Sequence, residues 1–351
     1  MINVEEIIRG SFDEHKISQM QLDPNGHCNA ACWFCPVSIK GNPVHAKKPM
    51  PVDLLRKVIE NMIEERDRED GLVSKNFGGF YTSHYNETLL YPYLEDFFKI
   101  LREYKLMTMI LSNGTTLTPN KTDMIKEYQD VINGVNLNVP VLSDAELWAK
   151  RAGTKPGMYN NLIRNIKYFT ENMPHLVQSG VFSIGMNGVN SNSLVEYGGW
   201  IERGEKFPVD MDLNPDIGEN AMEVKKAKEM FPGVNVYGMP HLIDRAGLMD
   251  GIIDNKKAIN NYLKHKKEDA VVVGCGNGFE VGGRPVGWIH INSLGQAFLC
   301  CNDYDMDIVI GDFTKQNLRD FWGSDEHIQK IKESYEGICT VCASAKFDTD
   351  E

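Results

Sequence analysis

Three cysteines lie close together near the start of the chain, in the run HCNAACWFCP at residues 27–36. Cys28, Cys32 and Cys35 have CxxxCxxC spacing and follow a short apolar run. Three thiolates at this spacing can hold three corners of a cubane [4Fe–4S] cluster and leave the fourth iron open to a small molecule. A closed zinc site uses four ligands. The triplet therefore indicates a reactive iron–sulfur centre.

A second group of cysteines occupies the C-terminal part of the chain. Gly295 and Cys300 form a GxxxxC unit, and GICTVC near the end contains a CxxC pair. Four thiolates can fully ligate a second iron–sulfur cluster, but they also suit a structural zinc ion, and spacing does not separate the two. The open triplet upstream favours iron–sulfur. The four expected ligands are Cys275, Cys300, Cys339 and Cys342.

The triplet, with Phe34 just before its last cysteine, resembles the signature of the radical S-adenosylmethionine (radical SAM) superfamily. The resemblance implies that the open iron chelates the amino and carboxylate groups of SAM. One electron then cleaves SAM to a 5'-deoxyadenosyl radical, which abstracts hydrogen from carbon. The C-terminal pattern resembles a twitch domain, a truncated SPASM domain, whose four cysteines fully ligate one auxiliary [4Fe–4S] cluster. We therefore expect two clusters and SAM as cofactors.

Composition limits the class of partner. The chain has 351 residues, of which 42% are hydrophobic, and a formal net charge of -12. This length can bury a large core, and the negative field would repel phosphates, which argues against nucleic-acid and membrane-surface partners. The start MINVEEIIRGSFDEH is too acidic for a signal peptide. We expect a cytoplasmic enzyme with a small-molecule substrate and a reductant such as flavodoxin or ferredoxin.

Short apolar runs alternate with longer amphipathic segments over the first two thirds of the chain. Such alternation predicts an α/β fold with a parallel sheet and right-handed crossovers. Six units match the partial (β/α)6 TIM-like barrel of the radical SAM family, followed by a small α+β iron–sulfur domain. We expect a barrel at 1–240, a linker at 241–255 and the auxiliary-cluster domain at 256–351. The expected strands are 17–22, 76–81, 106–111, 134–139, 180–186 and 208–213, and the helices are 51–65, 92–104, 120–128, 158–172, 193–203 and 220–230.

Polar residues at the ends of the expected strands are candidates for binding SAM, since barrel sites form at the C-terminal strand ends. HYNETLLYPYLEDF resembles the family's GGEP segment, which places Asn86, Glu87 and Thr88 where the SAM amino group binds. Thr88 departs from the family's proline. Alternatively, Glu87 belongs to a helix-capping loop. Arg151 is a candidate partner for the SAM carboxylate, and its alternative interpretation is a solvated helix residue. The other candidates implied by the resemblance are Phe34, Ser112, Asn113, Asn138 and Met186.

Cys301 follows the GxxxxC cysteine, where sulfatase-maturating relatives carry an acid that faces the substrate. A thiol there could donate a hydrogen atom to a substrate radical, as in radical SAM epimerases, or it could be a buried apolar residue or a substitute ligand. Asp303 and Asp305 are candidate proton acceptors for an oxidation. His84 could reach SAM or substrate, whereas His290 is expected to be structural.

We favour a two-electron oxidation of a small polar, sugar-like metabolite over epimerisation through Cys301, because the oxidation uses all four matched cysteines. A radical peptide-modifying enzyme is less favoured, since only about 15 residues precede the first expected strand. The non-enzyme alternative is an iron–sulfur electron-transfer or zinc-binding protein. Aromatic residues that could stack on a sugar ring or belong to the core are Trp148, Trp200, Trp288 and Tyr304.

Overall fold

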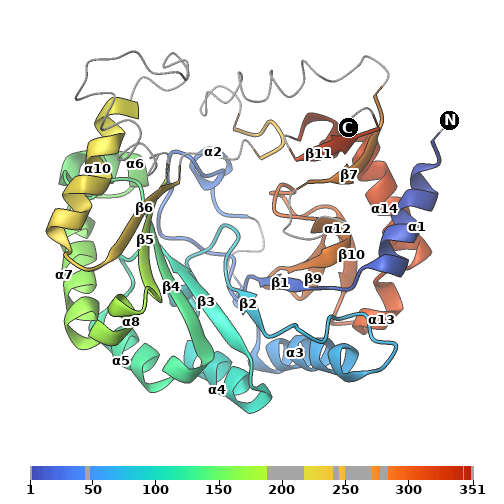
Figure 1. The fold of residues 1–351 in the computed structure, drawn as a ribbon, viewed down its shortest axis with the longest axis horizontal. Coiled ribbons are helices and arrows are strands. Elements are labelled where there is room, and N and C mark those ends of the chain that lie inside the picture. The colour runs from blue at the N-terminus through green and yellow to red at the C-terminus, as the bar shows by residue number, and fades with distance from the viewer. Residues whose placement is uncertain are drawn as a thin grey trace.

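The structure, a computed structural model, describes residues 2–43, 48–187, 217–239, 245–249, 270–276, 284–342 and 344–348. Its main feature is a nine-stranded curved sheet in the order β10-β9-β8-β1-β2-β3-β4-β5-β6 (Figure 1). Strands β1 to β6 are parallel to their neighbours. Their bounds are β1 (Gln19–Leu22), β2 (Gly79–Tyr81), β3 (Met107–Ser112), β4 (Ile132–Val139), β5 (Phe182–Asn187) and β6 (Asn235–Met239).

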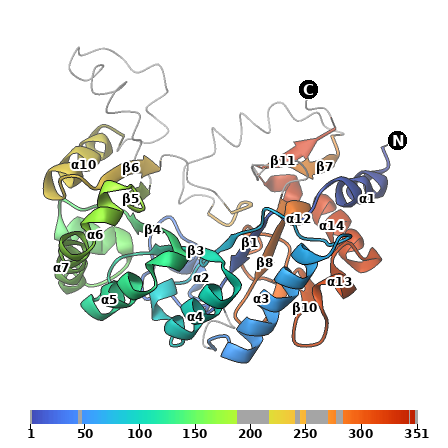
Figure 2. The same cartoon turned by 60° about the horizontal axis from the view of Figure 1, so that its bottom comes forward.

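Helices cover the outer side of this sheet (Figures 1 and 2). In α3 the buried residues Leu55, Val58, Ile59 and Met62 repeat at helical spacing, and they share one core with Met20 of β1. The helices of this part are α3 (Val52–Asp67), α4 (Leu94–Tyr104), α5 (Pro119–Glu127), α6 (Ala145–Ala152), α7 (Gly157–Asn172), α8 (Pro174–Gln178) and α10 (Ile217–Met230), with 3-10 turns η2 (Thr88–Leu90) and η3 (Gln129–Val131).

The α/β class and the first five expected strands are confirmed within a few residues at each end. The expected strand at 208–213 and helix at 193–203 lie outside the described residues. The strand that pairs with β5 is β6, which the sequence pattern missed. Its run NVYGM follows α10, whereas the sixth strand was expected before that helix.

The C-terminal region adds three strands to the same sheet. β8 (Trp288–Ile291) runs parallel to β1, and β9 (Gln296–Phe298) and β10 (Val309–Asp312) follow it in antiparallel order. A second sheet pairs β7 (Val272–Cys275) with β11 (Ala345–Phe347). The remaining helices are α1 (Val4–Glu14), α2 (Val37–Lys40), α12 (Arg284–Gly287), α13 (Leu318–Phe321), α14 (Asp325–Glu336) and η5 (Ile338–Val341). The expected domain boundaries stay predictions.

Pairing of β8 with β1 has a consequence for the site. Gln21 of β1 lies between His290 of β8 and Tyr81 of β2 in the strand register. Residues far apart in the sequence thus meet at the C-terminal ends of neighbouring strands, where barrel sites form. None of the described helices combines the length and the apolar character needed to cross a membrane.

His327 of α14 is fully buried beside the rings of Phe12 and Trp322. Its Nδ1 accepts a hydrogen bond from the Gly323 N–H at 3.1 Å. Burial, helped by the nearby Lys330 charge, lowers the pKa of His327 to about 3. The folded protein therefore holds this imidazole neutral at pH values where the unfolded chain protonates it.

The first prediction follows from this difference in proton binding. Because the unfolded state binds the extra proton, stability is present above the unfolded pKa and is lost as the pH falls towards the folded pKa. Between pH 7.5 and pH 5 this one group should lower the free energy of unfolding by about 2 kcal/mol. His327→Gln should remove that part of the decline in urea unfolding of the apoprotein. Exposed His175→Gln is the control, and equal declines in both variants would contradict the assignment.

Candidate active site

The loop after β1 carries the cysteine triplet and is held by side chains from its own ends. Asn42 closes it, because its Oδ1 accepts from the Cys28 N–H at 2.8 Å and its Nδ2 donates to the Cys28 carbonyl at 3.2 Å. A turn then brings Cys35 N–H to the Cys32 carbonyl at 2.8 Å. All three cysteines line one cavity of about 110 Å³, together with Phe34, His84, Asn86, Glu87, Ser112, Asn113 and Asn138.

Ionisation of the three thiols of the triplet is strongly disfavoured in the absence of a metal centre. Burial raises the pKa of Cys28 to about 12, and it raises the pKa of Cys32 further, with the nearby Cys35 and Cys28 adding to the effect. Cys35 is raised as well, mainly by burial. Thiolates at such a place need a cationic partner. A metal cluster that binds them as thiolates would supply it, so the donor set fits an iron–sulfur cluster.

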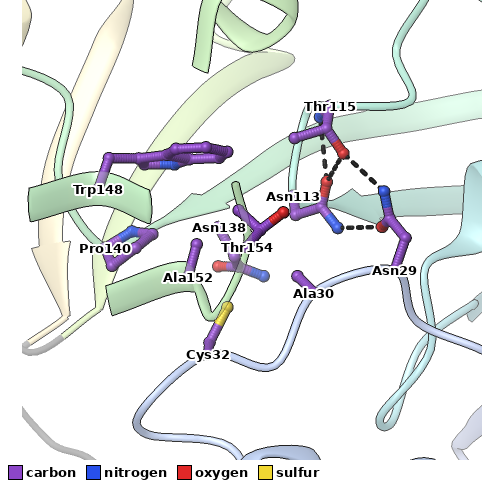
Figure 3. A pocket seen from close by; sticks show the side chains of 10 residues that line it. All are labelled: Asn29, Ala30, Cys32, Asn113, Thr115, Asn138, Pro140, Trp148, Ala152 and Thr154. Atoms are coloured by element: carbon purple, nitrogen blue, oxygen red, sulfur yellow. Dashed lines mark hydrogen bonds between the residues drawn. The ribbon is translucent and has the colours of Figure 1, made fainter. Parts of the chain in front are cut away.

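The C-terminus of helix α6 packs against the cysteine loop. The Ala31 N–H donates to the Ala152 carbonyl at 3.0 Å, and the Trp33 N–H donates to the Arg151 carbonyl at 2.9 Å. Gly153 has a left-handed backbone with φ of 61°, and a Cβ atom there would lie 2.2 Å from the Ala31 carbonyl oxygen. Only glycine fits this close approach. Ala152, Cys32 and Trp148 line the narrow pocket at this junction (Figure 3).

An amide network stands beside the triplet (Figure 3). Asn113 Nδ2 donates to Asn29 Oδ1 at 2.8 Å, and Asn29 Nδ2 donates to Thr115 Oγ1 at 3.0 Å. Asn113 Nδ2 also lies 3.9 Å from Cys28 Sγ. Asn138, at the end of β4, lines both this pocket and the main cavity. The network fixes an N–H group near a cysteine sulfur, where hydrogen bonds tune an iron–sulfur cluster.

Glu87 ties the loop after β2 to the loop after β3. Its carboxylate accepts from Ser112 Oγ at 2.8 Å, from the Asn113 N–H at 2.7 Å and from Thr116 Oγ1 at 2.8 Å. Glu87 also caps η2 by accepting from the Leu89 N–H. Burial raises the pKa of Glu87, although these donors stabilise its charged form. The observed contacts of Glu87 are therefore those expected if it caps a helical turn. Its direct contact with SAM stays a prediction.

Asn86, by contrast, has an uncommitted acceptor. Its Nδ2 donates to the Thr82 carbonyl at 3.2 Å, while its Oδ1 is buried and has no hydrogen-bond partner among the described residues. A buried unsatisfied oxygen is costly, which makes it a natural acceptor for a ligand N–H group. Asn86 lines the cavity that holds the cysteines. This orphaned atom fits an ammonium group bound there.

Three other predicted SAM contacts lie away from the cavity lining. Thr88 is buried and donates from Oγ1 to the Thr82 carbonyl at 2.9 Å. Met186 is fully buried in the main hydrophobic core, and Arg151 contributes its carbonyl to the Trp33 N–H. Neither Thr88, Met186 nor Arg151 lines a described pocket. Their contact with SAM remains a prediction.

The four C-terminal cysteines come together between the small sheet and α14. Cys300 and Cys339 each have Cys275 as a neighbour, and Cys339 also faces Cys342. Burial raises the pKa of Cys339 to about 12. Asn302 donates from its backbone N–H to Cys300 Sγ at 3.4 Å and from Nδ2 to Cys342 Sγ at 3.1 Å, and Ser344 N–H donates to Cys342 Sγ at 3.4 Å. Such N–H···S bonds are typical of iron–sulfur sites.

Within the parts of the chain that the structure describes, no three His, Cys, Asp or Glu side chains are gathered around one point as a single metal ion requires. Four thiolates are chemically suitable for either zinc or an iron–sulfur cluster. The donor set by itself therefore leaves both open.

A hydrophobic cluster lies between the loop that carries the triplet and the C-terminal hairpin that carries Cys300. We call it the bridging cluster; its buried members are Val37, Tyr85, Phe298, Tyr304 and Met306, with Ala31, Cys35 and Leu248 packed against them. Tyr85 Oη donates to the Cys301 carbonyl and Tyr304 Oη donates to the Gly41 carbonyl. These two contacts connect the C-terminal hairpin with the loops after β1 and β2. Cys35 of the triplet thus packs against this cluster, and Tyr85 of the cluster contacts Cys301, the residue that follows Cys300.

Arg245 is the cation of this region. Its guanidinium carbon lies 5.2 Å from the centre of the Tyr85 ring. Tyr85 together with Cys301, Cys35 and Cys300 raises the pKa of Arg245, outweighing the opposite effect of burial. Sequence reasoning missed Arg245, because no motif surrounds it. The same holds for Asn29 and Asn42, whose roles depend on contacts across the loop.

The candidate catalytic residues Cys301 and Asp303 are both buried. Cys301 Sγ lies 3.9 Å from Asn302 Oδ1. The Asp303 carboxylate accepts from the Ile308 N–H at 2.9 Å and the Asp307 N–H at 3.3 Å, and burial raises its pKa to about 6. Asp305 forms an ion pair with Lys40. Asp303 thus shapes the turn before β10, and neither acid lines the main cavity.

Comparisons with known proteins bear on this arrangement. The radical SAM superfamily model matches residues 23–201, about half of the chain, and the model of SPASM, an iron-sulfur cluster-binding domain, matches residues 283–343. No curated protein matches the sequence.

Solved structures share the fold at low sequence identity. Streptococcus suis SuiB bound to S-adenosylmethionine has a TM-score of 0.52 and 15% identity over 95% of this chain and 73% of that one. Native anSMEcpe with bound AdoMet has a TM-score of 0.50 and 14% identity, covering 93% and 88%. BtrN in complex with AdoMet and 2-DOIA has a TM-score of 0.49 and 17% identity, covering 94% and 93%. These likenesses speak for the fold alone.

The superfamily match covers the cysteine triplet and strands β2 to β5, and the second match covers three of the four C-terminal cysteines. Both domains are associated with [4Fe–4S] clusters, and the SAM-bound structures share this fold. The expected cofactor types, [4Fe–4S] clusters and SAM, are thereby confirmed. The chain belongs to the radical SAM superfamily and carries a C-terminal SPASM-type iron–sulfur domain.

Proposed function

We propose that the protein catalyses a two-electron oxidation of a small polar, sugar-like metabolite. The observation that carries this proposal is the packing around the bridging cluster, where Cys35 of the triplet packs, Tyr85 contacts the Cys301 carbonyl next to Cys300, and Arg245 lies within electrostatic reach of both Cys35 and Cys300. A three-cysteine cluster binds SAM and supplies the radical, whereas a cluster with four thiolate ligands has no open iron and suits electron transfer. Cys28, Cys32 and Cys35 would hold the first, and Cys275, Cys300, Cys339 and Cys342 the second.

The inner wall of the sheet, meaning the face opposite the helices, carries side chains that would suit a polar substrate. Met20, Phe80 and Ile289 point into the core beneath the helices, so their neighbours in the strands face the opposite side. Those neighbours are polar or aromatic: Tyr81 and Trp288 stack with ring centres 5.8 Å apart and planes at 5°. Aromatic faces beside polar groups are suited to sugar-like rings. Of the proposed stacking residues, Trp148, Trp288 and Tyr304 are buried, and Trp200 lies outside the described residues.

Different residues of the chain would bind the cofactors, position the loops around them and offset their charge. Asn86 Oδ1 would accept a hydrogen bond from the SAM ammonium, Glu87 would hold the two loops that frame it, and Asn113 would direct an N–H group at the Cys28 sulfur. Arg245 would offset negative charge between the two cysteine groups. The bridging cluster would keep water out of the path between them.

Epimerisation is the second candidate, favoured by the position of Cys301. This residue is buried, its carbonyl accepts from Tyr85 Oη, and it contributes to the electrostatic environment of Arg245. The thiol thus belongs to the residue that follows Cys300 and contacts Tyr85 of the bridging cluster. It could return a hydrogen atom to a substrate radical.

The reaction test uses the full chain reconstituted under anaerobic conditions with iron and sulfide. With SAM, dithionite and a panel of hexoses, inositols and aminocyclitols in deuterated water, we expect 5'-deoxyadenosine and a product two mass units lighter than its substrate. Cys339→Ala should lower the oxidised product at least tenfold relative to 5'-deoxyadenosine, because it removes a ligand of the electron acceptor. A product of unchanged composition carrying solvent deuterium, lost in Cys301→Ala, would instead establish epimerisation.

The second prediction of this section concerns SAM binding. Asn86→Ala removes the orphaned oxygen and should weaken the SAM affinity of the reconstituted protein about tenfold, the effect of about 1.4 kcal/mol. Asn86→Asp is the matched control, since it also loses the Nδ2 bond to Thr82 but keeps an acceptor for the ammonium group. Isothermal titration calorimetry with SAM compares the affinities of the two variants. Equal affinities of the alanine and aspartate variants would refute the role of this oxygen.

The third prediction concerns the junction of α6 with the cysteine loop. A Cβ atom at Gly153 would displace the Ala31 carbonyl, so Gly153→Ala should lower bound iron from about eight towards about four per chain. Gly180→Ala is the matched control: Gly180 has φ of 75°, but nothing lies within 4 Å of its would-be Cβ. It carries similar backbone strain and should keep all its iron. Full iron in Gly153→Ala would show that the loop does not depend on this contact.

A further inference from the structure

A chain of buried titratable groups stands beside the cavity. Asp23 follows β1, His84 lies in the loop after β2, and His290 is in β8. Asp23 Oδ1 accepts from the His84 backbone N–H at 2.8 Å and lies 3.0 Å from His84 Nδ1. On the other side of the ring, His84 Nε2 lies 2.6 Å from His290 Nδ1. The side chains of Asp23 and His84 are 1% and 0% exposed.

These contacts fix where the protons lie. The Asp23 carboxylate can only accept, so His84 Nδ1 carries a hydrogen. His84 Nε2 and His290 Nδ1 must then share one proton, because their separation is that of a hydrogen bond. Asp23 Oδ1 thereby orients the His84 ring, and Asp23 Oδ2 has no hydrogen-bond partner among the described residues. This is the arrangement of a proton acceptor oriented by an acid.

The rings are held in place by packing. Phe298 of β9 contacts both imidazoles, with ring centres 5.1 Å from His84 and 5.7 Å from His290. Tyr85 lies beside His84 at 6.4 Å, and Trp288 stacks along His290 at 6.2 Å. A base whose orientation is fixed loses little entropy when it reacts.

The position of His84 in the cavity places these three groups near the reaction. His84 lines the cavity with Cys28, Cys35 and Asn113, and it is the only histidine among the lining residues of the described pockets. Asp303 and Asp305, the acceptors expected from the sequence, are engaged by backbone N–H groups and by Lys40. The groups already assigned to SAM and to the clusters leave the proton of an oxidation without an acceptor.

We propose that His84, oriented by Asp23 and paired with His290, accepts the hydroxyl proton that the substrate loses during its oxidation. The inference rests on the proposed function. Loss of a hydrogen atom from a carbinol carbon to the 5'-deoxyadenosyl radical leaves a carbon radical that still bears its O–H group. The O–H bond breaks as a C=O bond forms, and its proton bonds to the lone pair of His84 Nε2, which gives up its hydrogen bond to His290. The remaining electron would be taken up by an oxidised [4Fe–4S] cluster, which Cys275, Cys300, Cys339 and Cys342 would hold. A one-electron acceptor protein later reoxidises that cluster.

The first test needs no cofactor. In the full-length apoprotein labelled with ¹⁵N-histidine, a strongly deshielded proton coupled to an imidazole nitrogen should report the bond shared by His84 and His290. His84→Gln and His290→Gln should each abolish it, and the exposed-site variant His175→Gln should keep it. Absence of this signal from the wild-type protein, or its persistence in His84→Gln, would overturn the shared proton.

The second test measures the ratio of oxidised product to 5'-deoxyadenosine in the reconstituted full chain. We expect this ratio to fall at least tenfold in His84→Gln and in Asp23→Asn, since the radical forms but cannot complete its oxidation. Iron content and circular dichroism equal to those of the wild type identify folded variants, and Asp23→Asn serves if His84→Gln does not fold. An unchanged ratio in a folded variant would refute the proposed base. Absence of oxidised product from the wild-type protein would instead refute the proposed function.

Discussion

Thiols that are shielded from water do not ionise unless positive charge accompanies them, and this constraint governs both ends of the molecule. Burial raises the pKa of Cys28, Cys32, Cys300 and Cys339, and neighbouring sulfurs strengthen the effect. Among the described residues, the compensating groups include N–H donors from Asn113, Asn302 and Ser344 and the guanidinium of Arg245. Each group of cysteines is therefore a site that requires a metal centre to hold its sulfurs as thiolates.

The second organising feature is the sheet, which extends past β1 into the C-terminal region. A parallel β8 beside β1 brings the C-terminal hairpin against the loops after β1 and β2. The bridging cluster fills this junction with aromatic and aliphatic side chains, and Tyr85 and Tyr304 connect it by hydrogen bonds to opposite sides. As a result, the loop that carries the triplet and the C-terminal hairpin that carries Cys300 meet in one packed region.

Much of this could be predicted from the sequence, and the reasons differ by element. Cysteine spacing predicted the triplet, because ligands on one loop carry their geometry in their spacing, and the resemblance to a twitch domain predicted the C-terminal group. Helical periodicity located α3, α4 and α7, since each buries one face. The position of β6 was missed because the sixth strand was expected before α10, at 208–213, whereas β6 follows that helix. The pairing of β8 with β1, and hence the contact of His84 with His290, could not be predicted, because no local pattern encodes a partner some 200 residues away. For the same reason the contacts that fix Asn29, Asn42 and Arg245 in the site were not foreseen.

The most direct test of the central claim is electron paramagnetic resonance of the dithionite-reduced, reconstituted protein with and without SAM. The account predicts two [4Fe–4S]⁺ signals, of which only one shifts when SAM is added, and Cys28→Ala should remove that signal while leaving the other. Two signals that both ignore SAM, or a SAM-sensitive signal that persists in Cys28→Ala, would contradict it.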